Sequence, residues 1–156
     1  MANYQLDIDV DERFRPLVDE TWMEQVVQKA LEVGGTEATV ELSLVIADDE
    51  TVQRLNKQYR GVDEPTDVLS FAFLEDHPDF PFPLAPGGLP HLGEVVISYP
   101  RAAQQAVEEG HPVEQELALL IAHGVLHLLG YEHQEREEER VMKAKEAEIL
   151  AKLERQ

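Results

Sequence analysis

The sequence predicts a single α+β domain over residues 1–156, close to the α/β class, with a small mixed sheet of four strands and about five packed helices. The length, 156 residues, is that of one domain and is enough to bury a core. Four short segments have strand patterns, and the segments between and after them have helical patterns. Their order, β-α-β-α-β-β-α-α-α, is that of a sheet with helices packed on it.

Strand patterns occur in four segments. Residues 4–10 (YQLDIDV) alternate apolar and acidic side chains, which is typical of a strand with one solvated face. Residues 39–47, 68–74 and 94–98 are short apolar runs rich in β-branched or aromatic residues. Between the last two strands, residues 75–92 contain five of the nine prolines and predict a long loop, which in a compact domain is usually functional or disordered.

The first two helices are predicted between these strands. One runs from about residue 21 to 33, with Trp22 expected in the core. The next is capped by Asp48 or Asp49 and ends near residue 59, before a glycine. Its predicted apolar face consists of Val52, Leu55 and Tyr59.

Three further helices are predicted in the C-terminal half. The first begins near Pro100, which suits a first helical turn, and ends near Glu109. The second contains the apolar run 117–122 and the histidines that follow it, and the third is charged and spans about 135–153. His77, His91 and His111 are expected to be solvated loop residues.

The segment HGVLHLLGYEH, residues 123–133, contains half of the histidines of the chain. Residues four apart on a helix lie about 40° apart around its axis, so His123 and His127 can point at one spot. Gly130 can take the left-handed conformation that turns the chain back and returns His133 to them. Three imidazoles leave one position of a tetrahedral ion open, which predicts a catalytic, zincin-like site for one Zn²⁺. Nickel, copper or iron would also bind three imidazoles.

This spacing is also the ligand skeleton of the metzincin metalloproteases, H-E-x-x-H-x-x-G-x-x-H. The chain has Gly124 where those enzymes carry the glutamate that acts as general base. A zinc held by three neutral imidazoles keeps its double positive charge and lowers the pKa of bound water toward neutrality. The lack of the glutamate is therefore less damaging to hydrolysis, although the sequence does not identify another general base. Glu132 and Asp67 are candidates to accept a proton or orient an imidazole, although each could be a plain surface carboxylate.

Composition limits the partners. The sequence shows no apolar stretch long enough for a membrane helix and no signal peptide, and the lack of a targeting signal favours a cytoplasmic protein. The lack of cysteine is compatible with this location. Its net charge of −19 argues against indiscriminate binding to nucleic acid. Residues 51–62, however, contain Arg54, Lys57 and Arg60 and no acid. They could be a solvated helix face or a basic island that orients a phosphate.

Three blocks together resemble one family, the YbeY-type metal-dependent endoribonucleases. The blocks are HGVLHLLGYEH, LNKQYRGVDEPTDVLSF (residues 55–71) and LGEVVIS (residues 92–98). The resemblance implies that His123, His127 and His133 bind zinc and that Arg60 contacts the cleaved phosphate. The sequence departs from the family pattern at Glu132, where aspartate is usual, and at Ala72, where proline is frequent.

The resemblance implies a single-strand-specific, zinc-dependent endoribonuclease that acts in ribosomal RNA 3′-end maturation and ribosome quality control. Its partners would be a ribosomal RNA precursor and the ribosome or ribosomal proteins, with Arg54 and Lys57 binding the RNA and no role for a membrane. Two alternatives remain at this point: a metallopeptidase-like hydrolase, and a non-catalytic ribosome-assembly factor with a structural metal. The sequence does not indicate the oligomeric state.

Overall fold

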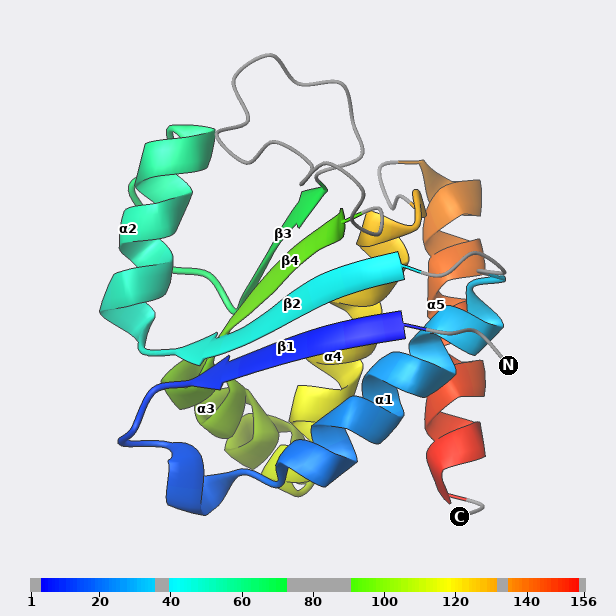
Figure 1. The fold of residues 1–156 in the computed structure, drawn as a ribbon, viewed down its shortest axis with the longest axis horizontal. Coiled ribbons are helices and arrows are strands. Elements are labelled where there is room, and N and C mark those ends of the chain that lie inside the picture. Colours follow the sequence, from blue (N-terminus) through cyan, green and yellow to red (C-terminus); the bar gives the residue numbers. More distant parts are fainter. Residues whose placement is uncertain (1–3, 36–39, 73–90, 132–134, 155–156) are drawn as a thin grey trace.

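Four strands form one twisted sheet in the order β1-β2-β4-β3 (Figure 1). The computed structural model describes residues 4–35, 40–72, 91–131 and 135–154. The strands are β1 (Tyr4–Val10), β2 (Val40–Ala47), β3 (Val68–Ala72) and β4 (His91–Ser98). β1, β2 and β4 are parallel neighbours, whereas β3 pairs antiparallel with β4 and places Ser70 opposite Val95. The predicted mixed sheet of four strands is confirmed.

The side chains of β4 are buried on both faces of the sheet, whereas the edge strand β1 has one exposed face. On β4, Val95 and Ile97 belong to the main hydrophobic core, while Val96 between them belongs to a smaller cluster on the other face. The smaller cluster also includes Val52 and Leu69. This alternation follows from the period of two along a strand.

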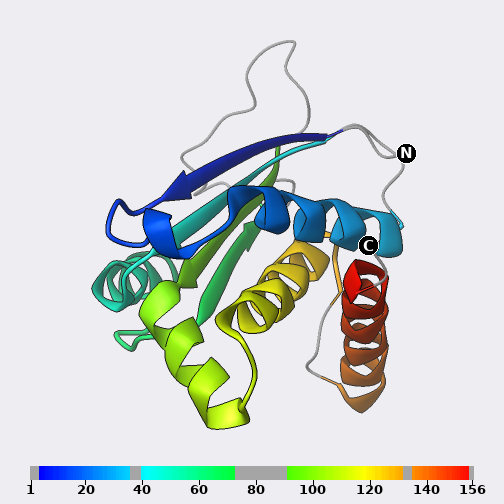
Figure 2. The ribbon, with the colours of Figure 1, turned by 90° about the horizontal axis from the view of Figure 1, so that it is seen from below.

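Five helices accompany the sheet, as predicted, within the described part of the chain. They are α1 (Glu20–Val33), α2 (Asp49–Arg60), α3 (Tyr99–Glu109), α4 (Val113–Leu128) and α5 (Arg136–Glu154), with a short 3-10 turn at Arg15–Leu17. α1, α3, α4 and α5 lie on one side of the sheet (Figure 2). α2 supplies Val52 and Leu55 to the cluster on the opposite face. None of the described helices is long and apolar enough to cross a membrane.

Helix α4 lies at the centre of the main core. It packs against β3, β4, α1, α3 and α5, and ten of its sixteen residues are buried. Only five side chains of this helix are charged or polar, and two of them are His123 and His127, both half-buried. The position of the histidine motif is fixed by packing on several sides.

Several predicted details differ from the structure. Tyr59 was expected on the apolar face of α2, but its side chain is 47% exposed, because the sheet covers only the part of the helix near Val52 and Leu55. Trp22 is half-buried rather than fully in the core, and its Nε1 donates to the carbonyl of Glu114 at 3.3 Å. The loop predicted over 75–92 ends earlier, since β4 begins at His91. Residues 75–90 of that loop lie outside the described residues.

Candidate active site

The imidazoles of His123 and His127 lie side by side on α4. Their ring centroids are 4.7 Å apart and the ring planes meet at 77°. This is the placement expected for residues four apart on one helix face. Gly130, just after α4, has φ +100° and so takes the positive-φ conformation expected for the turn that follows the helix. His133 and Glu132 lie outside the described residues, so the return of a third imidazole remains a prediction.

Gly124 lies where α4 packs most closely on the sheet. A Cβ atom at this position would come within 2.6 Å of Val95 Cγ1, 3.0 Å of Val95 Cγ2 and 3.3 Å of Ser70 Oγ. Real Cβ contacts under 3.0 Å essentially never occur, so a larger residue would push the helix off β4. The glutamate of the metzincin skeleton therefore has no space in this fold.

Arg60 is connected to the histidine helix through a single residue of β3. Its Nη2 donates to the carbonyl oxygen of Ser70 at 2.9 Å, and its guanidinium carbon lies 5.9 Å from the centre of the Phe71 ring. The Ser70 hydroxyl in turn donates to the carbonyl of Gly124 at 3.3 Å, next to His123. The last residue of α2 and the histidine motif thus meet at the same strand.

Arg54 and Lys57 are exposed on α2, on the same helix as Arg60. Lys57 Nζ lies 3.8 Å from a carboxylate oxygen of Asp63, an exposed pair that contributes little to stability. Both side chains can therefore be reached by an anionic ligand. Their predicted role in substrate binding is not tested by these contacts.

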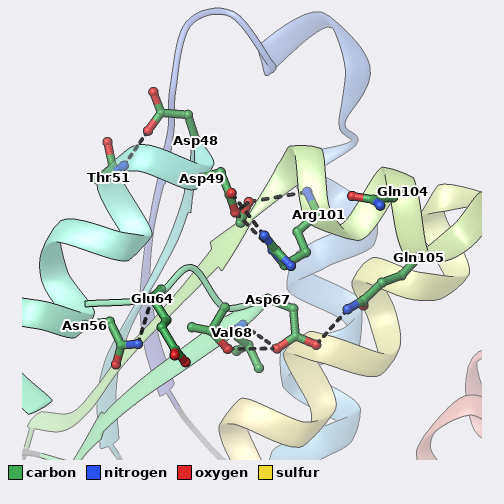
Figure 3. Close-up of polar contacts among 12 residues, drawn as sticks. Asp48, Asp49, Thr51, Asn56, Glu64, Asp67, Val68, Arg101, Gln104 and Gln105 are labelled. Atoms are coloured by element: carbon green, nitrogen blue, oxygen red, sulfur yellow. Dashed lines mark hydrogen bonds and ion pairs between the residues drawn. The ribbon is translucent and has the colours of Figure 1, made fainter. Parts of the chain in front are cut away.

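Asp67 has a structural role in the described residues. It accepts from the backbone N–H of Val68 at 2.8 Å and from Gln105 Nε2 at 3.3 Å, which ties the start of β3 to α3 (Figure 3). Nearby, Arg101 forms an ion pair with Asp49, joining α3 to α2. These contacts hold Asp67 at the junction of β3 and α3, which favours a structural role for this acid.

One carboxylate next to the histidine motif was not found from the sequence. Glu146 of α5 places Oε2 3.3 Å from Nδ1 of His123. The two side chains also line one hollow of about 380 Å³, together with Glu139, Met142 and Lys143. Glu146 is 23 positions from His123, and no local pattern could have brought the two together.

A second group of possible metal ligands lies at the junction of α3 and α4. Glu109, His111 and Glu116 each offer a donor atom, and these atoms all lie within 4.8 Å of one another. His111 Nε2 is 3.1 Å from Glu116 and 3.7 Å from Glu109, and burial raises the pKa of Glu116 while the bond from His111 lowers it. His111 was expected to be a solvated loop residue. It does lie between α3 and α4, but the expected solvation is wrong, because its side chain is 17% exposed and held by the buried Glu116.

This second group is distinct from the histidine pair. His111 lies just before α4, whereas His123 lies ten residues after the first residue of that helix, which is about 15 Å along it. The described residues thus contain a candidate His/Glu metal site that the sequence did not predict, in addition to the paired histidines of the motif.

The single α+β domain has paired histidines on its central helix, and the arginine at the end of α2 is linked to that helix through Ser70 of β3. This arrangement suits a metal-dependent hydrolase. Comparison with known proteins defines it further. The family model described as "Endoribonuclease YbeY" matches residues 5–154. The chain therefore belongs to the YbeY endoribonuclease family, and the predicted family and enzyme class are confirmed at that level.

Individual relatives agree over almost the whole chain. A protein named Endoribonuclease YbeY from Dehalococcoides mccartyi is 45% identical over 90% of this chain and 87% of its own length. Proteins of the same name from Roseiflexus castenholzii and Pelotomaculum thermopropionicum are 45% and 46% identical, covering 97% and 98% of this chain and 94% and 95% of theirs. The solution structure of TM1509 from Thermotoga maritima is similar, with a TM-score of 0.62 and 25% identity over 96% of this chain and 89% of that one.

Proposed function

We propose that this protein, over residues 1–156, is a zinc-dependent endoribonuclease specific for single-stranded RNA, acting in ribosomal RNA 3′-end maturation and ribosome quality control. Family membership supports RNA as the substrate class. The observation that carries the proposal is the link from Arg60 through Ser70 to Gly124, because it connects a cation that could bind phosphate to the histidine motif through one strand.

The residues of the motif fit a zinc site. His123 and His127 have adjacent rings on a rigid helix, and His133 is the proposed third ligand. A zinc ion held in this way would supply Lewis acidity and activate water for hydrolysis. The residues of the chain hold the ring positions, because α4 is packed against the sheet through Gly124 and cannot shift easily.

Arg60 is the proposed catalytic cation. A guanidinium has five N–H groups, and the bond to the Ser70 carbonyl uses one of them while it fixes the direction of the others. The planar group can then offer two parallel N–H groups to the cleaved phosphate and offset charge that develops on it.

The surface next to Arg60 suits an unpaired strand of RNA. Tyr59 is 47% exposed, and its ring meets the edge of the Phe71 ring at a centroid distance of 5.5 Å. An exposed aromatic ring can stack on an unpaired base, and the exposed Arg54 and Lys57 can contact backbone phosphates. The net charge of the whole chain is −19, and the acidic surface elsewhere would restrict RNA to this region.

The test is cleavage of a single-stranded ribosomal RNA fragment by the purified protein. We expect Arg60→Ala to lower the rate by about 10²- to 10³-fold, since loss of one positioned donor to a developing charge has that effect. His123→Ala should abolish cleavage. Arg140→Ala is the matched control, because it removes the same charge from an exposed side chain on α5, on the other side of the molecule from α2 (Figure 1). If all four proteins cleave alike, the proposal is wrong.

The two alternative functions give different results. A metallopeptidase would cleave peptides rather than RNA, and the lack of space at Gly124 for a glutamate disfavours it. In a non-catalytic assembly factor with a structural metal, chelation would remove much of the helical circular dichroism signal. In the proposed enzyme, chelation stops cleavage while the helical signal remains, because the apolar core holds the fold.

The proposed partners are the ribosome or ribosomal proteins, and the proposed location is the cytoplasm. Both can be examined by sedimenting a lysate through a sucrose gradient and locating the protein. Cosedimentation with ribosomal subunits that is lost at high salt would support an electrostatic contact through α2.

A further inference from the structure

Glu146 occupies an unusual place for a carboxylate. The side chains of α5 that enter the core are Met142, Ile149 and Leu153, each at most 4% exposed. Glu146 lies four residues after the first of these and three before the second, so it belongs to the same face of the helix. Its side chain is only 12% exposed.

A carboxylate on the buried face of a helix loses hydration, and it destabilises the fold unless a hydrogen-bonding or charged partner compensates for this loss. The partner that the structure provides is His123, whose side chain is 27% exposed and whose Nδ1 lies 3.3 Å from Glu146 Oε2. An ionised carboxylate can only accept hydrogen bonds, so a hydrogen bond to it requires the imidazole tautomer that carries a proton on Nδ1. A proton on Nδ1 leaves Nε2 with the lone pair that a metal requires.

We propose that Glu146 is a positioning residue, which holds the His123 ring in the orientation and tautomer that bind the metal through Nε2. The proposal rests on the proposed function, in which His123 is a zinc ligand. Second partners of this kind commonly orient metal-binding histidines, and their loss typically weakens metal affinity by about 10- to 100-fold. α5 would thereby contribute to the site although the proposed ligands all lie outside it.

The test is the affinity for Zn²⁺, measured by competition with a chromophoric chelator. All proteins carry His111→Ala, so that Glu109, His111 and Glu116 do not add a second binding event. We expect Glu146→Ala to weaken binding by about 10- to 100-fold, and Glu146→Gln to weaken it less, because its amide oxygen still accepts the N–H. Glu148→Ala, on an exposed position of the same helix, is the matched control and should bind as the parent does.

Two further measurements make the result decisive. His123→Ala should lose most of the affinity. If His123→Ala binds zinc as tightly as the parent, the proposed metal site is wrong, and the proposed role of Glu146 is then wrong as well. If His123→Ala loses zinc but Glu146→Ala does not, the metal site stands and the positioning role is refuted. Thermal unfolding in the presence of chelator separates the remaining case: a loss of stability in Glu146→Ala with unchanged zinc affinity would mean that Glu146 only fastens α5 to α4.

Discussion

The close contact between α4 and the sheet predicts an uncommon response to a small substitution, Gly124→Ala. Replacing a glycine inside a helix with alanine normally stabilises a protein, by about 1 kcal/mol. Here the new methyl group would lie 2.6 Å and 3.0 Å from the two Cγ atoms of Val95. Overpacking of this kind costs about 1 to 3 kcal/mol.

The net expectation is a loss of about 0 to 2 kcal/mol in the free energy of unfolding. For a chain of this length, each kcal/mol corresponds to about 2 to 4 °C in the melting temperature. Val95→Ala removes both Cγ atoms, so in that background Gly124→Ala should instead stabilise, by up to about 1 kcal/mol. The two substitutions should therefore show a coupling energy of about 1 to 3 kcal/mol.

Urea unfolding of the four proteins of this cycle, followed by the fluorescence of the single tryptophan and by circular dichroism, gives the coupling energy. Ala147→Gly, at an exposed position of α5, calibrates the intrinsic helix contribution and should cost about 1 kcal/mol. The reasoning is refuted if Gly124→Ala stabilises the native protein, or if its effect is the same in both backgrounds within about 0.5 kcal/mol.

Two further predictions concern the dependence of stability on pH. Hydrogen bonds from Thr51 and Arg13 lower the pKa of Asp48 from 3.8 to about 2 in the folded protein. The ionised Asp48 therefore stabilises the fold fully at pH values above 3.8, and this stabilisation is lost as the pH falls toward 2. Asp48→Asn keeps the helix cap, and its stability deficit should vanish near pH 2; a deficit that persists there contradicts the argument. Burial, and then the charge of Asp9, raise the pKa of Glu94 above 4.5, so the native state resists its ionisation and loses stability as the pH rises through this range. Glu94→Gln should be more stable than the native protein at neutral pH and equal to it well below pH 4.5, as measured by urea unfolding at both.

Patterns within a short stretch of sequence predicted most of the fold. The strand at residues 4–10 has the predicted bounds because its alternation of apolar and acidic residues is unambiguous. Asp48 caps α2, with an oxygen 2.7 Å from the N–H of Thr51, because an aspartate before an amphipathic run satisfies a helix donor. The adjacent rings of His123 and His127 follow directly from helical spacing.

Predictions that depend on distant parts of the chain were less successful. The exposure of Tyr59 depends on how far the sheet extends beneath α2, and the sequence of the helix alone does not predict that extent. The pairing of His111 with Glu116 depends on the conformation of the turn between α3 and α4. This turn places the loop residue His111 against the buried carboxylate of Glu116. The contact between Glu146 and His123 depends on the packing of α5, and a charged residue between apolar ones gives no indication of its partner.

The position of Ser70 on the edge strand β3 has a consequence for how the proposed site could be lost. Ser70 pairs with Val95 and uses its backbone oxygen to hold Arg60 and its side chain to hold α4. A slip of β3 by one residue along β4 would turn every side chain of the strand to the opposite face. Phe71 would then point at the histidine helix, where a glycine is already crowded, and the serine would point away from it. The register of the five residues of β3 on β4 thus sets the position of Arg60 relative to the histidines. A mutation that shifts this register would therefore abolish the activity of the proposed site without changing any of its residues.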